Sequence, residues 1–120
     1  MAGVLAGLTW AKAQGAALLV SLPCDTPLAP PDMVPRLIAA AGAAGPAMAR
    51  SPAGPHPLCA AWPTWLAAPL RACLEDGRHP AVHRFLEEAG ARFVDFPGDA
   101  DFLNVNTAED LAEAQRRLQA

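Results

Sequence analysis

Apolar residues along the chain alternate between helical and strand-like spacing. Helical spacing predicts a first helix over residues 4–14, and the continuous apolar run from Ala16 to Leu22, which ends at Pro23, predicts a parallel strand covered on both faces. The same spacings, with proline, glycine and threonine at the ends, predict the other elements: helices over residues 30–41, 63–76 and 80–89 and from Thr107 onward, and strands over residues 47–50, 58–62 and 92–96. This alternation predicts a single α/β domain over residues 1–120 with a mostly parallel sheet.

The last predicted helix carries its own start signal. Thr107 stands at the N-cap position, and Asp110 follows it three residues later, at the second position of a capping box. Leu111, Ala114 and Leu118 recur at helical spacing, so we expect them to form the buried stripe of this helix.

The first predicted strand lacks neighbours on one side. The pattern begins with a helix, and no strand precedes the apolar run from Ala16 to Leu22. An exposed edge of that composition favours aggregation or pairing with another chain. The sequence therefore predicts self-association, or completion by a separate N-terminal piece.

Composition and charge exclude several classes of protein. Charged residues make up 18% of the chain and the net charge is −3, which argues against a nucleic-acid-binding surface. The uncharged stretch over residues 1–11 is too short and too weakly apolar for a membrane span, and it has no basic region typical of a secretory signal. The three cysteines, Cys24, Cys59 and Cys73, are odd in number and widely spaced, so we expect a reducing, cytoplasmic location without a disulfide framework.

The strongest candidate for chemistry is Asp25, which follows the first predicted strand in the stretch from Leu22 to Pro27. Ligands of open α/β sheets bind at the carboxyl ends of strands. A carboxylate there is well placed to hold Mg²⁺, which takes one or two carboxylates together with substrate phosphates. The alternative is that Asp25 only caps a turn or the following helix.

A second candidate is the pair Asn104 and Asn106, which are spaced so that both amides project from one side of an extended backbone. Each amide offers a donor and an acceptor to a polar ligand. The alternative is that both residues simply form the turn before Thr107.

Gly3 and Gly7 fall on one face of the first helix, where they permit close approach of a ligand or of a packed strand. Arg78 follows Gly77 in a loop, where it could meet a phosphate or remain solvated. The other polar and aromatic candidates favour ordinary roles: surface positions for the histidines, core or rim packing for the tryptophans, and no nucleophilic role for Cys24 or the two serines. These residues are His56, His79, His83, Trp62, Trp65, Cys24, Ser21 and Ser51.

Taken in order, these stretches resemble the bacterial molybdenum cofactor guanylyltransferases over nearly the whole chain. The five matching stretches are Gly3-Val4-Leu5-Ala6-Gly7, Leu22-Pro23-Cys24-Asp25-Thr26-Pro27, His56-Pro57-Leu58 with Ala61-Trp62-Pro63, Gly77-Arg78 with Val82, Phe85, Leu86 and Gly90, and Phe102 to Leu111. The first has Val4 where the family has proline, and the last has Ala108 where the family has proline. The second and the last stretch form a fairly specific pair.

The resemblance implies a three-layer, Rossmann-like nucleotidyltransferase fold and transfer of GMP from GTP to molybdenum-molybdopterin, with pyrophosphate as the second product. It implies that Asp25 is catalytic and holds Mg²⁺ and the nucleotide, with Gly3 and Gly7 also contacting the nucleotide. It further implies that Asn104, Asn106 and Arg78 bind the pterin, and that a molybdoenzyme or its chaperone is a partner.

One family feature has no counterpart among these 120 residues. The family opens with a strand and a glycine-rich loop, L-A-G-G-x-S-x-R-M-G-x-D-K, which surrounds the triphosphate and supplies a lysine, whereas Lys12 lies in no such context. We therefore expect the chain to correspond to the N-terminally truncated, C-terminal part of a guanylyltransferase. The alternatives are a non-catalytic module that binds the pterin or a partner protein, and a fragment that does not fold alone.

Overall fold

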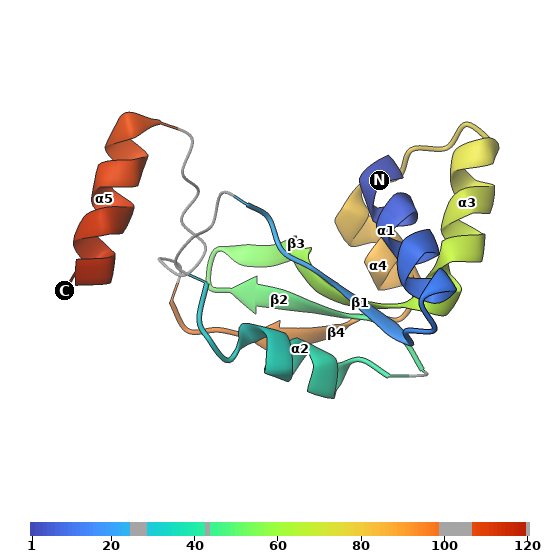
Figure 1. Cartoon of the computed structure of the whole chain (residues 1–120), viewed down its shortest axis with the longest axis horizontal. Helices are drawn as coiled ribbons and strands as arrows, with labels where there is room; N and C mark the ends of the chain where they lie inside the picture. Colours follow the sequence, from blue (N-terminus) through green and yellow to red (C-terminus); the bar gives the residue numbers. More distant parts are fainter. Residues whose placement is uncertain (25–28, 43, 99–106, 120) are drawn as a thin grey trace.

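The fold was analysed in a computed structural model, which describes residues 1–24, 29–42, 44–98 and 107–119. Helices and strands alternate along the chain (Figure 1). Their bounds are α1 Ala2–Ala13, β1 Leu18–Ser21, α2 Met33–Ala40, β2 Ala47–Ser51, β3 Gly54–Pro63, a 3-10 turn Thr64–Leu66, α3 Ala67–Glu75, α4 Val82–Glu88, β4 Arg92–Asp95 and α5 Ala108–Gln119. Every predicted element is present, with its ends shifted by a few residues.

The four strands form one mixed sheet in the order β1-β3-β2-β4. β3 pairs antiparallel with both β1 and β2, whereas β2 and β4 pair in parallel. β1, β2 and β4 therefore run in one direction and β3 runs against them. The predicted α/β fold is confirmed. Of the predicted mostly parallel sheet, three of the four described strands share one direction, but two of the three pairings are antiparallel. The carboxyl ends of β1, β2 and β4 lie at the same end of the sheet.

Helices cover both faces of the sheet, which gives the three layers that the resemblance implied (Figure 1). On one face, Leu8 of α1, Leu70 of α3 and Leu86 of α4 are fully buried around Met48 and Trp62 of the sheet. On the other face, α2 buries Met33 and Leu37 against small strand residues, with Val94 and Phe96 beside them. The small side chains are Ala47, Ala49, Cys59 and Ala61, and they let α2 approach the sheet closely.

The central strand β3 has an irregularity that its prolines explain. Met48 pairs with Ala60 but its neighbour Ala49 pairs with His56, so residues 57–59 are left over on β3. A proline has no N–H to donate to a ladder, and Pro57 opens this bulge. Strand β3 is longer than the predicted strand over residues 58–62, because it begins at Gly54, directly after the hairpin turn.

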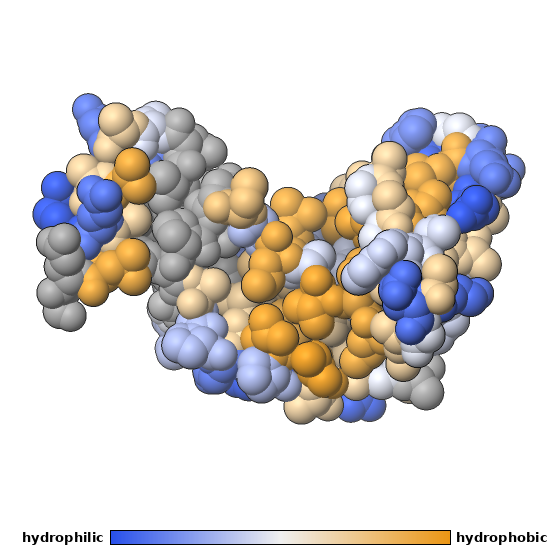
Figure 2. Space-filling view, in the orientation of Figure 1, coloured by the Kyte–Doolittle hydropathy of each residue, from blue (hydrophilic) through white to orange (hydrophobic). Residues whose placement is uncertain are grey.

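The prediction for residues 16–22 is wrong in two respects. β1 pairs antiparallel with β3, not in parallel, and all four of its residues are only half-buried. Thr64 N donates a hydrogen bond to Ala17 O. In an antiparallel ladder, residues that bond to the partner strand alternate with residues whose N–H and C=O groups point away from it. The N–H and C=O groups of Leu18 and Val20 therefore point away from β3. Within the described residues β1 is an edge strand, as the sequence predicted, and apolar side chains gather over it and over the adjoining α2 in Figure 2.

The prediction for the last helix is half right. Thr107 Oγ1 accepts a hydrogen bond from the Asp110 N–H at 3.1 Å, which confirms the cap. Of the expected buried stripe only Ala114 is buried, whereas Leu111 is 48% exposed and Leu118 is 65% exposed. The physical reason is that α5 stands beyond the strand ends (Figure 1), where the sheet does not cover this face.

Candidate functional site

The candidate site lies where β1, β2 and β4 end. β1 ends at Ser21 and leads through Cys24 toward residue 25, and β4 ends at Asp95 and leads through Gly98 toward residue 99. The predicted site residues Asp25, Asn104 and Asn106 follow these two strands and lie outside the described residues. The described ends of β1 and β4 show how the chain is anchored just before these three residues.

Ser21 anchors the end of β1 to β3. Its hydroxyl accepts a hydrogen bond from Nε1 of Trp62 at 2.9 Å and donates to the backbone oxygen of Leu58 at 2.9 Å. Trp62 is fully buried, so Ser21 satisfies an indole N–H that water cannot reach. Leu58 belongs to the bulge of β3, and one serine therefore ties β1 to both the bulge and the core.

Ser51 and His56 close the hairpin between β2 and β3. Ser51 Oγ lies 2.7 Å from His56 Nε2, and Ser51 is buried while His56 is half-buried. The prediction of a surface position for His56 is therefore wrong. The imidazole takes part in the structure of the strand end because the hairpin brings it back over the last residue of β2.

Arg50 and Asp95 join β2 to β4 at the same end of the sheet. The guanidinium donates from Nε to Oδ1 at 2.7 Å and from Nη2 to Oδ2 at 3.1 Å, which is a bidentate pair. This hydrogen bonding lowers the pKa of the Asp95 carboxyl and raises the pKa of Arg50. Arg36 of α2 donates to the backbone oxygen of Asp95 at 2.9 Å and stacks 4.4 Å from the ring centre of Phe96.

These contacts border a hollow of about 370 Å³, lined by Ser51, Pro52, Asp95, Phe96 and Pro97. The serine, imidazole and guanidinium groups around it are already bonded to one another. The described strand ends are therefore cross-linked by side-chain hydrogen bonds, and the ligand-binding groups predicted at this end of the sheet belong to the segments that begin after Cys24 and Gly98.

The two glycines of α1 differ in their surroundings. A Cβ added to Gly7 would meet Leu19 Cδ2 at 3.1 Å, which confirms that α1 packs closely on β1 at this position. A Cβ added to Gly3 would have no neighbour within 4 Å. Close packing thus accounts for Gly7, and the nucleotide-binding role of both glycines stays a prediction.

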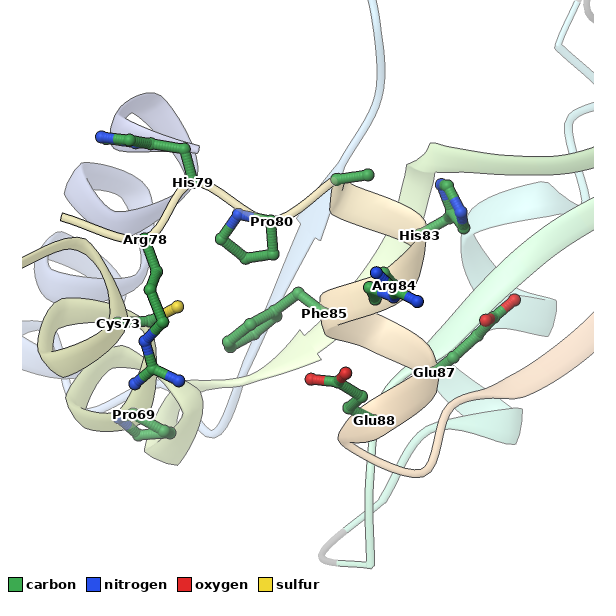
Figure 3. A pocket seen from close by; sticks show the side chains of 11 residues that line it. Pro69, Cys73, Arg78, His79, Pro80, His83, Arg84, Phe85, Glu87 and Glu88 are labelled. Atoms are coloured by element: carbon green, nitrogen blue, oxygen red, sulfur yellow. The ribbon is translucent and has the colours of Figure 1, made fainter. Parts of the chain in front are cut away.

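Arg78 lies away from the strand ends, in the connection between α3 and α4. Its Nη2 pairs with Asp76 Oδ2 at 3.2 Å, and both side chains are largely exposed. It lines a pocket of about 810 Å³ formed by α3, α4 and the residues between them, and no strand residue lines this pocket (Figure 3). Within the described residues, the structure does not bring Arg78 to the strand ends, and its role toward a pterin stays a prediction.

No three His, Cys, Asp or Glu side chains come together as metal ligands among the described residues. None of the helices described has the length and apolar character needed to cross a bilayer. The three cysteines are free thiols, with Cys59 buried in the sheet and Cys24 exposed at the end of β1.

Sequence reasoning missed the three links at the strand ends, namely Ser21 with Trp62, Ser51 with His56 and Arg50 with Asp95. A serine at the end of a strand is a usable signal for the first two, because a hydroxyl that is removed from water must find a partner. The third depends on β2 lying beside β4, which the order of strands along the chain does not disclose.

Comparison with known proteins places the chain in a family. The model of the MobA-like NTP transferase domain matches residues 1–93. The chain belongs to the MobA-like NTP transferase family. The match includes Gly3, Gly7, Asp25 and Arg78, whereas Asn104 and Asn106 lie beyond it.

Curated relatives extend the similarity to nearly the whole chain. The chain is 44% identical to the molybdenum cofactor guanylyltransferase of Cereibacter sphaeroides strain ATCC 17029 over 120 residues, which is 99% of this chain and 61% of that protein. It is also 44% identical to the molybdenum cofactor guanylyltransferase of Acidiphilium cryptum, over 96% of this chain and 57% of that protein. The chain thus spans about three fifths of the length of these MobA-like relatives.

Solved structures share the fold of this MobA-like chain. A protein from Aquifex aeolicus superposes with a TM-score of 0.72 at 20% identity, over 88% of this chain and 55% of that chain. The molybdopterin-guanine dinucleotide biosynthesis protein A of Archaeoglobus fulgidus superposes with a TM-score of 0.62 at 20% identity, over 91% of this chain and 60% of that chain. At this identity the likeness concerns the fold alone.

Proposed function

We propose that this chain takes part in the transfer of GMP from GTP to molybdenum-molybdopterin, which yields a pterin guanine dinucleotide. The observation that carries the proposal is the 44% identity, over 99% of the chain, to a relative named molybdenum cofactor guanylyltransferase. In this reaction a phosphate oxygen of the pterin forms a bond to the α-phosphorus of GTP. The bond from that phosphorus to the β-phosphate oxygen breaks, and pyrophosphate leaves.

The proposal assigns the central role to Asp25. Its carboxylate is the hard oxygen donor that Mg²⁺ prefers, and it follows a strand whose carboxyl end faces the candidate site. Bound Mg²⁺ neutralises phosphate charge, which is the main requirement of phosphoryl-type transfer. Asp25 would hold this Mg²⁺ against the triphosphate, and the link of Ser21 to Trp62 would fix the strand that precedes Asp25.

The remaining assignments concern the two substrates. Asn104 and Asn106 would bind the pterin through their amides, with Arg78 as a further contact that rests on the resemblance alone. Gly3 and Gly7 would contact the nucleotide, and the open space beside Gly3 is compatible with a neighbouring ligand.

The test is formation of the dinucleotide from molybdopterin, GTP and Mg²⁺ by the full chain and by Asp25→Asn. We expect the variant to lose about 100-fold or more in turnover, as is typical when a group that stabilises transition-state charge is removed. Glu75→Gln is the matched control, because Glu75 is an exposed carboxylate at the end of α3, away from the strand ends.

Two results would overturn the proposal: no dinucleotide from the folded wild-type chain, or equal turnover by the wild type and Asp25→Asn. If turnover is absent while molybdopterin still binds, the chain is a pterin-binding module instead. A binding measurement run beside the assay separates these outcomes.

A further inference from the structure

The two outer strands of the described sheet differ in how their free edges are protected. The order β1-β3-β2-β4 leaves β1 at one edge and β4 at the other. β4 carries the exposed charged residues Arg92 and Asp95, and charges on an edge strand discourage pairing with another chain. By contrast, residues 13–24 include no charged side chain, and β1 itself has neither a proline nor a bulge in its ladder with β3. Of the two edges, β1 is therefore the one open to another strand.

The free backbone groups of β1 belong to Leu18 and Val20. Both residues point their N–H and C=O groups away from β3. Pro63, which lies opposite Leu18, has no N–H to offer, in agreement with this alternation. The edge thus presents two donors and two acceptors, and Leu19 stands midway between them.

Apolar side chains flank this edge on both faces of the sheet. Leu19 lies under α1, where a Cβ at Gly7 would come within 3.1 Å of it. Val20 packs beside α2 on the opposite face. Ile38 of α2 is 44% exposed, and Figure 2 shows apolar side chains gathered over β1 and this helix. A strand added to the edge would therefore bury apolar surface in addition to forming backbone hydrogen bonds.

The first half of α1 leaves room beside the edge. Its exposed positions are the small residues Ala2, Gly3 and Ala6. Gly3 lies one turn before Gly7 on the same helical face, and a Cβ added to it would have no neighbour within 4 Å. This part of α1 therefore presents no bulky exposed side chain to an approaching strand.

We propose that β1 pairs antiparallel with β1 of a second copy of this chain, about a two-fold axis that passes through Leu19. In this register Leu18 of each copy lies opposite Val20 of the other copy, and each of these two pairs exchanges two hydrogen bonds. The four bonds use every free backbone group of the two strands. An axis through Leu18 or through Val20 would place the other residue opposite residue 22 or 16, outside β1.

A second copy fits this edge because the edge is complementary to itself. Rotation by 180° about Leu19 exchanges the free groups of Leu18 with those of Val20, and a self-complementary patch is what a two-fold interface requires. The uncharged stretch over residues 13–24 brings no like charges together across the axis. The four described strands of each copy would join into one sheet. Since the two β1 strands run in opposite directions, their carboxyl ends, and with them the two candidate sites, would point away from each other.

The first experiment measures the mass of the full chain by analytical ultracentrifugation over a dilution series. We expect a reversible equilibrium that approaches twice the chain mass of 12.5 kDa and stops there. A chain that remains monomeric up to about 1 mM, the range of a weak complex, would overturn the proposal and leave the edge to a different partner. Growth beyond two chains without a plateau would overturn it as well, because the edge would then drive open-ended aggregation.

Leu18→Lys tests whether this surface forms the dimer. Leu18 lies outside both buried clusters of the described chain, so the change spares the core, and thermal unfolding checks that the variant folds. We expect dimerisation to weaken about 10-fold, because both pairs of Leu18 with Val20 lose an apolar partner. The matched control is Leu118→Lys on α5, where the leucine is 65% exposed, and it should dimerise as the wild type does. Equal dimerisation by the two variants, or a loss in Leu118→Lys alone, would overturn the proposal.

Disulfide cross-linking tests the register, in a background that carries Cys24→Ser and Cys73→Ser. Leu19→Cys should form a disulfide between copies under mild oxidation, because its two Cα atoms would lie about 4.5 Å apart across the axis. Leu18→Cys should not, because the offset of two residues would separate its Cα atoms by about 8 Å, which is beyond the reach of a disulfide. Preferential cross-linking of Leu18→Cys would overturn this register.

The interface is independent of the proposed transfer reaction. Asp25→Asn changes a residue outside β1, so it should dimerise as the wild type does whether or not it loses turnover. Failure of the transfer reaction and failure of this interface are thereby told apart.

Discussion

The indole N–H of Trp62 and the hydroxyl of Ser21 are joined at 2.9 Å, and this bond connects the edge strand β1 to the centre of the sheet. Replacing Ser21 with alanine leaves a fully buried indole donor without its acceptor. We expect Ser21→Ala to lower the free energy of unfolding by about 1–3 kcal/mol, the cost of an unsatisfied buried polar group. Urea unfolding measures this change.

A double-mutant cycle isolates the bond itself. Trp62→Phe removes the donor, so Ser21→Ala made in that background should cost less than in the wild type, with a coupling energy of about 1 kcal/mol. Equal costs of Ser21→Ala in the two backgrounds would contradict a direct contribution of this hydrogen bond.

Gly45 is a position where a single methyl group should destabilise the fold. A Cβ there would lie 3.1 Å from the backbone oxygens of both Ala89 and Gly90, and backbone atoms cannot move aside as a side chain can. We expect Gly45→Ala to cost about 1–3 kcal/mol, as overpacking does, measured by urea unfolding. Gly42→Ala is the control, because a Cβ at Gly42 has no neighbour within 4 Å and the change should be small.

The ion pair of Arg50 with Asp95 has a measurable pH dependence. The hydrogen bonds from Arg50 lower the pKa of the Asp95 carboxyl below its ordinary value of 3.8. The stabilisation is therefore fully present above that ordinary value and is lost as the pH falls through the lowered pKa of the folded state. NMR titration should give a low pKa for Asp95 in the wild type and a value closer to 3.8 in Arg50→Ala; identical titrations would disprove the coupling.

Leucines of the core and of α5 should respond differently to truncation. Leu86 is fully buried among α1, α3 and the sheet, so Leu86→Ala should cost about 2–5 kcal/mol through lost burial and a residual cavity. Leu118 is 65% exposed, and Leu118→Ala should change the free energy of unfolding by less than about 0.5 kcal/mol. Thermal or urea unfolding compares the two; a large loss in Leu118→Ala would show that α5 packs on the body of the protein.

Local patterns were sufficient to predict the elements of this fold. Helical spacing located α1 and α4, and Thr107 marked the start of α5 because its hydroxyl satisfies an N–H that the helix leaves free. Periodicity could not reveal that β3 lies between β1 and β2, since strand order depends on long-range pairing. The direction of β1 relative to its neighbour was wrong for that reason.

At the site, the sequence indicated which strand ends carry functional segments, but not what holds those ends. His56 was expected at the surface and Ser21 was given no role beyond its place in the predicted strand, although both are bonded within the sheet. Their partners lie across the β1–β3 ladder and the β2–β3 hairpin, so the contacts exist only once those pairings are known. The α3–α4 pocket likewise needs the packing of two helices that no local motif describes.

The reversed direction of β3 has a consequence for the order in which the sheet is assembled. β2 and β3 are joined by a tight turn that pairs Ser51 with Gly54, whereas β1 pairs Ser21 with the distant Ala60. Closing the short loop costs less chain entropy, so we expect the central hairpin to nucleate folding and β1 to dock late. In hydrogen exchange of the monomer, β1 should then lose its amide protons before the hairpin does, so the strand that precedes Asp25 would open before the centre of the sheet.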